Sequence, residues 1–148
     1  MLKTHTKVLI VDDEPENVRY LQTILEENGF HDIHSAKDGD EGLKKAKALM
    51  PGLMILDVRM PKKTGIVVFN ELKSIWKYKN IPIIILTGEG EFLKQLTALR
   101  GYREDGDLSV QKPTEEVLSQ FIQHKPEAFL EKPVEPEALM KAVKAILN

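Results

Sequence analysis

Three short runs of apolar residues constrain the fold of this chain more than any other feature. They lie at Lys7 to Val11, Leu53 to Leu56 and Ile81 to Leu86, and each is apolar nearly throughout instead of alternating. Continuous apolarity at this length, with many β-branched residues, is typical of a parallel strand covered on both faces. The three runs therefore predict the central strands of a parallel sheet.

Segments with helical periodicity lie between and after these runs. The first begins at Pro15 and stops at an Asn-Gly pair, and the four segments span residues 15–29, 38–50, 65–76 and 136–147. Proline at the first turn and glycine after the last are usual helix boundaries. The apolar stripe of the second segment includes Met50, and that of the third ends at Ile75 or Trp76. Each segment is a predicted helix.

Two weaker strand patterns, at His31 to Ala36 and Ala128 to Glu131, complete an alternating order of strands and helices. This order predicts an α/β protein with right-handed crossovers and helices on both faces of a five-stranded parallel sheet. A length of 148 residues is that of one compact domain. In such sheets the active crevice lies at the carboxyl ends of the strands, where the strand order reverses.

Composition excludes several classes of function. Lys and Arg number 21 against 23 Asp and Glu, so no basic excess favours bulk binding to nucleic acid or to acidic membranes. The chain has no cysteine, which excludes disulfides and thiolate chemistry and suits a reducing compartment. No apolar run approaches the roughly 20 residues of a membrane helix. We expect a soluble, cytoplasmic protein.

Acidic residues follow the strands where the crevice is expected. Asp12, Asp13 and Glu14 come after the first strand and Asp57 after the third. If the strand order is 2-1-3-4-5, the first and third strands are neighbours and these acids converge. Two carboxylates about 4 Å apart repel by about 4 kcal/mol at an effective dielectric constant of about 20, so such a cluster needs a cation or raised pKa values. Mg²⁺ accepts carboxylate and phosphate oxygens and supplies that charge.

Together with Thr87-Gly88 after the fourth strand and Lys132-Pro133 after the fifth, these acids resemble the receiver domain of two-component response regulators. The resemblance covers most of the chain and implies the doubly wound, flavodoxin-like (CheY-like) sheet of order 2-1-3-4-5. It implies that Asp57 is the nucleophile, which accepts a phosphoryl group as an aspartyl phosphate. Such a domain catalyses only its own phosphorylation and dephosphorylation.

The resemblance also implies roles for the surrounding residues. Asp13 and Asp57 would bind Mg²⁺ directly, with Asp12 acting through water and the backbone carbonyl of Arg59 as a further ligand. Lys132 would contact the phosphoryl oxygens. The donor would be a phosphohistidine on a sensor histidine kinase or a phosphotransfer protein, and the output a downstream protein or an effector domain outside this chain.

A conformational switch is implied by Thr87 and Phe129. Phosphorylation adds a charge of about -1.5 to -2 and three acceptor oxygens, which would draw the hydroxyl of Thr87 toward them. Phe129, on the fifth strand, would turn into the vacated space. One hydrogen bond to a charged group contributes about 1.5 to 3 kcal/mol, so the expected response is a shift of one or two decades between existing conformers.

The connection between the fourth and fifth strands is too long for an ordinary crossover, because 44 residues separate Thr87 from Lys132. Within this enlarged crossover, residues 89–127, stripes at Glu91 to Arg100 and Thr114 to Gln123 predict two helices. They could pack on their own domain or form a surface for a partner. Lys112-Pro113 also competes for the role of Lys132, but only Lys132 follows a strand pattern with an aromatic residue in place.

Three other functions are weighed against phosphoryl acceptance. A receiver-like interaction module that is not phosphorylated would not need the acids, the threonine and the lysine together. A magnesium-dependent phosphatase needs Asp-x-Asp after the first strand, where this chain has Asp12-Asp13-Glu14-Pro15. A flavin mononucleotide carrier needs phosphate-binding donors there, and three acids would repel its ligand.

Overall fold

Five parallel strands form one sheet in the computed structural model of the protein, which describes residues 2–60, 64–88 and 124–148. Their order is β2-β1-β3-β4-β5, which confirms the predicted fold class and topology. The strands are β1 (Val8–Val11), β2 (Ile33–Ala36), β3 (Leu53–Asp57), β4 (Ile83–Thr87) and β5 (Ala128–Glu131).

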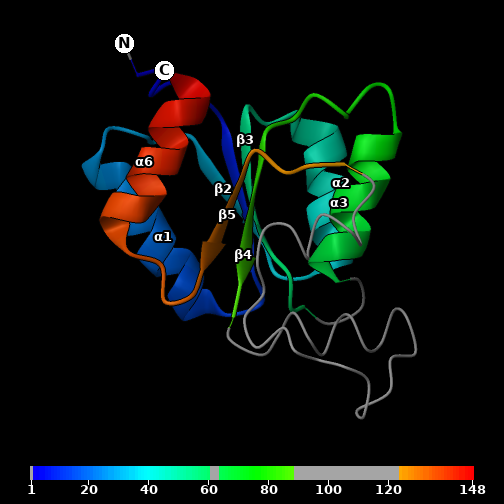
Figure 1. The fold of residues 1–148 in the computed structure, drawn as a ribbon, viewed down its shortest axis with the longest axis horizontal. Coiled ribbons are helices and arrows are strands. Elements are labelled where there is room, and N and C mark those ends of the chain that lie inside the picture. Colours follow the sequence, from blue (N-terminus) through cyan, green and yellow to red (C-terminus); the bar gives the residue numbers. More distant parts are fainter. Residues whose placement is uncertain (1, 61–63, 89–123) are drawn as a thin grey trace.

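The helices of the described ranges cover both faces of the sheet (Figure 1). One face carries α1 (Pro15–Glu27) and α6 (Pro136–Leu147), and the other carries α2 (Gly39–Leu49) and α3 (Gly65–Ser74). The buried side chains accordingly form two apolar clusters, one on each face. All residues of β1, β3 and β4 are buried, which is why their sequences are apolar without alternation.

Local signals in the sequence explain where the helices begin. Pro15 and Pro136 occupy the first turns of α1 and α6, where a missing N–H leaves no hydrogen bond unmade. Asp38 caps α2, because its carboxylate accepts a hydrogen bond from the backbone N–H of Glu41 at 2.8 Å. Thr64 caps α3 in the same way through the N–H of Val67.

Two residues assigned to buried helix stripes are exposed instead. Met50 takes a left-handed backbone conformation (φ 48°) as the C-cap of α2, and its side chain is 45% exposed. The α conformation is disfavoured before Pro51, so the helix ends there. Helix α3 stops at Ser74, where the backbone of Ile75 becomes extended, and Trp76 is 82% exposed.

The enlarged crossover is described only at its end, from residue 124 onward. Both helices predicted within it, and Lys112, lie outside the described residues. Among the helices of the described ranges, none combines the length and the apolarity that crossing a membrane requires.

Candidate functional site

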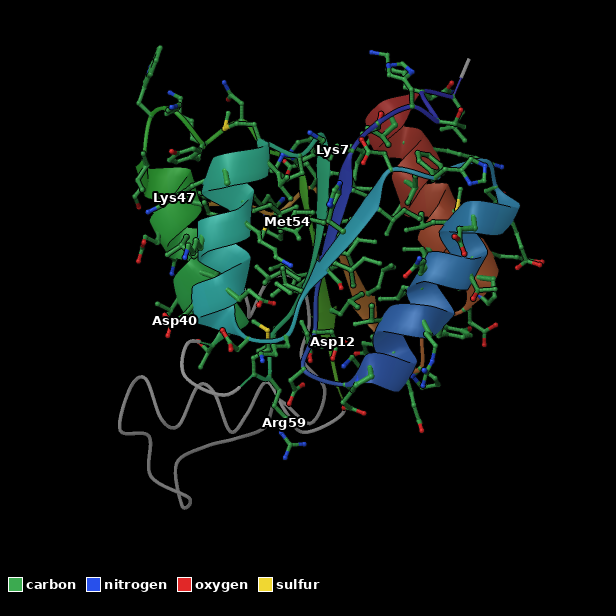
Figure 2. All side chains as sticks on the ribbon, turned by 180° about the vertical axis from the view of Figure 1, so that it is seen from behind. Lys7, Asp12, Asp40, Lys47, Met54 and Arg59 are labelled. Carbon is green, nitrogen blue, oxygen red and sulfur yellow. The ribbon has the colours of Figure 1, made fainter. Side chains whose placement is uncertain are left out.

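Three carboxylates meet at the carboxyl ends of β1 and β3, as the sequence predicts. Asp12, Asp13 and Asp57 each offer an oxygen atom, and these atoms lie within 4.8 Å of one another. β1 and β3 are paired neighbours, so the residues that follow them arrive at the same edge of the sheet. Figure 2 shows Asp12 and Arg59 together at this edge, opposite Lys7.

Strand alternation explains which side chains can meet. Val8 and Ile10 of β1 and Ile55 of β3 pack in the cluster under α1 and α6. Because side chains alternate with a period of two, Asp12 and Asp57 also point to this face. Leu130 of β5 packs in the same cluster, and two residues later the alternation directs Lys132 there too.

The ammonium group of Lys132 spans the acidic pair. Its Nζ lies 3.1 Å from Asp57 Oδ2 and 3.4 Å from Asp12 Oδ2. The backbone N–H of Lys132 donates to the carbonyl of Thr87 at 2.7 Å, which ties the residue to the end of β4. The structure therefore brings Lys132 to the acids, whereas the competing Lys112 lies outside the described residues.

The other carboxylate oxygen of Asp12 and that of Asp57 each accept a hydrogen bond from the backbone. Asp12 Oδ1 accepts a hydrogen bond from the N–H of Glu14 at 3.0 Å, and Asp57 Oδ1 accepts one from the N–H of Arg59 at 3.3 Å. Glu14, not Asp12 or Asp13, is the N-cap residue of α1, and no side chain caps that helix. Helix capping therefore does not account for the two aspartates.

Burial shifts the protonation of Asp57. Desolvation and the nearby charge of Asp12 raise the pKa of Asp57 from 3.8 to about 7, although the charge and hydrogen bond of Lys132 and the N–H of Arg59 lower it. Desolvation alone would lower the pKa of Lys132, but the charges and hydrogen bonds of Asp57 and Asp12 outweigh it and raise that pKa above 10.5. Burial is thus the main cause of the raised pKa of Asp57 and the charge of Asp12 the second, and both favour a cation beside these carboxylates.

Thr87 and Phe129 lie on the opposite face of the sheet. Ile85 pairs with Phe129 across β4 and β5 and, like Phe129, packs with the cluster under α2 and α3. Thr87 follows Ile85 by two residues, so it shares that face, and it is 2% exposed. The two predicted switch residues are therefore diagonal neighbours on adjacent strands.

Gly65 is a residue at the site whose role the sequence analysis missed. Its N–H donates to the carbonyl of Val58 at 2.9 Å, and a Cβ at this position would overlap the carbonyl oxygen of Asp57. The close approach lets α3 begin directly behind Asp57. A glycine at the first residue of the predicted helix 65–76 was the available signal, but only the coordinates show what it contacts.

The residues of the site differ in their exposure. The side chain of Asp57 is only 3% exposed and that of Lys132 22%, whereas Asp13 is exposed. A hollow lined in part by Asp12, Asp13, Arg19 and Lys45 opens beside them. A separate apolar cavity of about 330 Å³ lies beyond Lys132, against α1 and the start of the α6 connection.

Comparison with known proteins decides the family. The family model described as "Response regulator receiver domain" matches residues 8–119. The chain belongs to this family. The match ends at residue 119, before β5 begins. In the structure Lys132, which follows β5, nevertheless lies beside the acids.

Curated relatives of this receiver domain are longer proteins. It is 33% identical over 142 residues to the alkaline phosphatase synthesis transcriptional regulatory protein PhoP of Bacillus subtilis, covering 96% of this chain and 48% of the relative. It is 32% identical over 117 residues to the hybrid signal transduction histidine kinase D of Dictyostelium discoideum, covering 78% of this chain and 7% of that protein. The chain thus spans half or less of the length of these relatives.

Solved receiver structures share the fold. The signal receiver domain of a signal transduction histidine kinase from Syntrophus aciditrophicus matches with a TM-score of 0.69 and 25% identity, covering 96% of this chain and 89% of that one. The chemotaxis response regulator CheY4 of Vibrio cholerae matches with a TM-score of 0.68 and 26% identity, covering 97% and 100%. This receiver domain is therefore a two-component signalling module with the CheY-like sheet.

Proposed function

We propose that this receiver domain accepts a phosphoryl group on Asp57 from a phosphohistidine of a sensor histidine kinase or a phosphotransfer protein. One observation carries the proposal: the oxygens of Asp12, Asp13 and Asp57 converge within 4.8 Å while Lys132 Nζ lies 3.1 Å from Asp57. An acidic pocket with one ammonium group at its edge suits a reaction that adds phosphate oxygens to a carboxylate.

A divalent cation completes this charge pattern. Three carboxylates with close oxygens are the donor set that Mg²⁺ prefers, and the residues that would hold it are Asp12, Asp13, Asp57 and the carbonyl of Arg59. Bound there, Mg²⁺ supplies the positive charge that the acids lack and offsets their repulsion of an incoming phosphoryl group. The raised pKa of Asp57 supports this role, because it reflects the burial of the carboxylate and, second, the nearby charge of Asp12.

The chain's own residues position the reacting group. The N–H of Arg59 and the ammonium of Lys132 hold the two oxygens of Asp57. The new P–O bond forms at a carboxylate oxygen as the P–N bond of the donor breaks, and the electron pair of that bond stays on the donor imidazole. Lys132 then moves from the carboxylate to a phosphoryl oxygen, where its charge stabilises the product.

The conformational response begins at Thr87. Its hydroxyl would turn toward the phosphoryl oxygens, and Phe129 would fill the space that it leaves. The support is their diagonal placement on the same face of β4 and β5 and the tie between the Lys132 N–H and the Thr87 carbonyl. Since β5 is the last strand in the order of the described strands, the change reaches one side of the described sheet, where we place the contact with a partner.

The output lies with a downstream protein or an effector domain outside residues 1–148. Relatives named transcriptional regulatory protein and histidine kinase support a place between a kinase and a regulator. The 148 residues form one receiver domain in this proposal, in the cytoplasm, and residues 89–127 are its enlarged crossover. The domain itself contacts no nucleic acid and turns over no substrate other than its own phosphoryl group.

Intact-mass measurement tests this function directly. The parent chain, Asp57→Asn and the control Asp40→Asn are incubated with acetyl phosphate, with Mg²⁺ or with EDTA. We expect one phosphoryl adduct on the parent and on Asp40→Asn with Mg²⁺ only, and none on Asp57→Asn. An adduct that survives in Asp57→Asn or forms equally in EDTA contradicts the proposal, and the absence of any adduct on the parent favours an interaction module that is not phosphorylated.

A further inference from the structure

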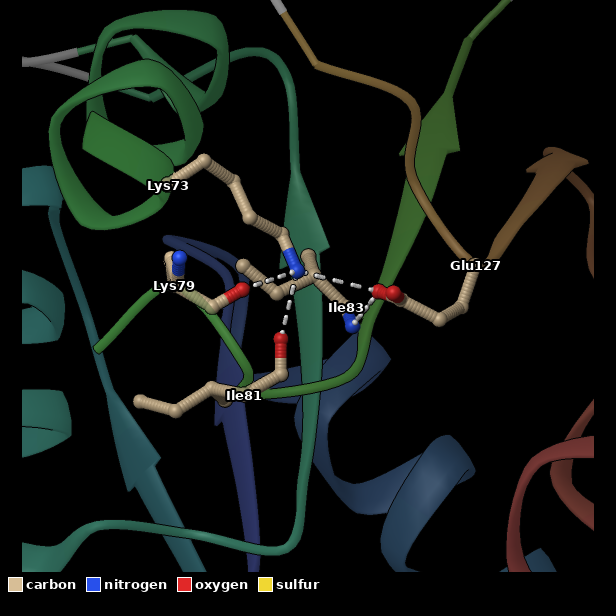
Figure 3. A network of polar contacts seen from close by, with 5 residues as sticks. All are labelled: Lys73, Lys79, Ile81, Ile83 and Glu127. Atoms are coloured by element: carbon tan, nitrogen blue, oxygen red, sulfur yellow. Dashed lines mark hydrogen bonds and ion pairs between the residues drawn. The ribbon is translucent and has the colours of Figure 1, made fainter. Parts of the chain in front are cut away.

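A buried lysine lies at the edge of the sheet opposite the acids. Lys73, in the last turn of α3, has a side chain that is only 6% exposed. Its Nζ donates to the carbonyls of Ile81 at 2.8 Å and Lys79 at 3.1 Å, and to Glu127 Oε1 at 3.3 Å (Figure 3). An ammonium group removed from water needs such partners, so this group is held by three acceptors instead of solvent.

Glu127 binds the start of β4 twice. Its Oε1 accepts the backbone N–H of Ile83 at 2.7 Å, and its own N–H donates to the carbonyl of Ile83 at 3.1 Å. β5 begins only at Ala128, and Glu127 follows a proline. The Glu127 side chain thus supplies the acceptor for the first N–H of β4 that faces β5. We call Lys73, Glu127 and their contacts at Lys79, Ile81 and Ile83 the β5 clamp.

The apolar pattern of β5 specifies its register poorly. The strand reads Ala-Phe-Leu-Glu, and its three apolar residues, which lie on both faces, are only partly buried. A shift by one residue would still place apolar side chains on each face, so burial alone discriminates weakly between registers.

A register error at β5 would disable the acidic site. Lys132 is five residues after Glu127, about 16 Å along an extended strand. A one-residue shift would replace Lys132 by Glu131 or Pro133 at the position facing Asp57 and turn its side chain to the other face. Glutamate there would add a further negative charge to the acids instead of neutralising them.

We infer that Lys73 and Glu127 are positioning residues for phosphoryl acceptance, because the β5 clamp fixes the register that places Lys132 on Asp57. This inference deepens the proposed function and rests on it. The clamp touches neither Asp57 nor the phosphoryl group, so its inferred effect on phosphoryl acceptance is indirect, through the placement of β5.

A double-mutant cycle separates positioning from general stabilisation. Glu127→Gln and Lys73→Met are each measured in the parent and in Lys132→Ala, with acetyl phosphate and Mg²⁺ at a temperature where every variant is folded. We expect the rate of adduct formation to fall about tenfold in the parent background, since small displacements of reacting groups are costly, and less than about twofold once Lys132 is absent. If each clamp substitution lowers the rate of adduct formation by the same factor in the parent and in Lys132→Ala, the inference is overturned.

Two further variants sharpen the comparison. Lys73→Arg keeps the charge and the donors, so it is expected to retain at least about half of the parent rate. Lys47→Met is the control, because it breaks a comparable ion pair away from β5. Lys47 Nζ lies 3.5 Å from Glu71 Oε2, and each of these side chains is 36% exposed. This control is expected to leave the rate within about twofold. A loss in Lys47→Met as large as in Lys73→Met contradicts a specific role.

The register itself is measured without any phosphodonor. Backbone NOEs between β4 and β5 report the pairing of Ile85 with Phe129 in the parent. We expect Glu127→Gln, which keeps an oxygen for the Ile83 N–H and tests the charge alone, to show additional cross-peaks from a pairing shifted by one residue. If Glu127→Gln keeps the register of the parent, the inference is overturned, whether or not the variant forms the adduct more slowly. If the parent takes up no phosphoryl group the proposed function fails, and the NOEs still decide whether the clamp sets the register.

Discussion

The ammonium group of Lys132 lies 3.1 Å from the carboxylate of Asp57, although β4 separates β5, which Lys132 follows, from β3, which ends at Asp57. Lys132 reaches across because it follows the last residue of β5 and its N–H is held by Thr87. The positions of Asp57 and its counter-charge are thus set by two strands that do not pair with each other. Any change in the placement of β5 alters the electrostatics of Asp57.

Replacing this lysine is expected to slow phosphoryl acceptance. In Lys132→Ala the developing charge loses one hydrogen bond from a charged donor, which contributes about 1.5 to 3 kcal/mol, or roughly one to two decades in rate. The time course of the phosphoryl adduct by intact mass measures this, with Lys141→Ala on the exposed face of α6 as the control. A rate within twofold of the parent would assign the counter-charge to another residue.

Stability should depend on pH through Asp57 when no divalent ion is present. The pKa of Asp57 is raised from 3.8 to about 7 by burial and by Asp12, so between these values the folded chain holds a proton that the unfolded chain releases. The free energy of unfolding therefore falls as the pH rises from about 4 to about 7 and does not change further at higher pH. The fall is about 1.4 kcal/mol for each unit by which the folded-state pKa exceeds the unfolded-state pKa.

Asp57→Asn supplies the reference for this titration, because the amide carries no charge at any pH. Urea unfolding in EDTA at several pH values between 4.5 and 8.5 gives the stability of the parent relative to Asp57→Asn. We expect the parent to lose stability relative to the variant up to neutral pH. A difference that is independent of pH would show that Asp57 titrates near its ordinary value.

Magnesium should stabilise the folded chain through the acids. At a concentration ten times its dissociation constant the ion adds about 1.4 kcal/mol, seen as a rise in the melting temperature over a sodium chloride control of equal ionic strength. Asp13→Asn is expected to reduce this rise while changing the metal-free stability by less than about 0.5 kcal/mol, because Asp13 is exposed. An undiminished rise in Asp13→Asn, with Asp40→Asn as the comparison, would place the ion elsewhere.

The contact behind Asp57 predicts a strong effect of a single methyl group. In Gly65→Ala the new Cβ would overlap the backbone of Asp57 and Val58, which cannot withdraw as a side chain can, so unfolding should become easier by about 1 to 3 kcal/mol. Gly52→Ala is the matched control, since its Cβ would meet the movable side chain of Thr6. Equal stabilities for the two variants, measured by urea unfolding, would contradict this.

Periodicity predicted the helices and strands well where a sequence signal marks the end. The strand at Ala128 to Glu131 and the helix at Pro136 to Leu147 have the predicted bounds. The third helix was predicted too long because no glycine or proline marks its end, and an apolar stripe does not show where hydrogen bonding stops. Trp76 therefore appeared as a stripe residue, although it is exposed.

The acidic site was predictable and the β5 clamp was not. Asp12 and Asp57 follow apolar runs that must lie in one sheet, so sheet topology alone brings them together. Lys73 and Glu127 are 54 residues apart, and each has the appearance of an ordinary surface charge in the sequence. Only packing shows that α3 buries one of them against the start of β5.

The two chain ends of the described structure lie beside each other at the edge of the sheet opposite Asp12, with the N–H of Lys3 3.4 Å from the carbonyl of Leu147 (Figures 1 and 2). A tag fused to either end can therefore anchor the molecule to a sensor chip or a bead with the acids directed away from the support, toward the solution. Immobilised in this orientation, the domain can be offered kinases from solution without the anchor competing for the same face.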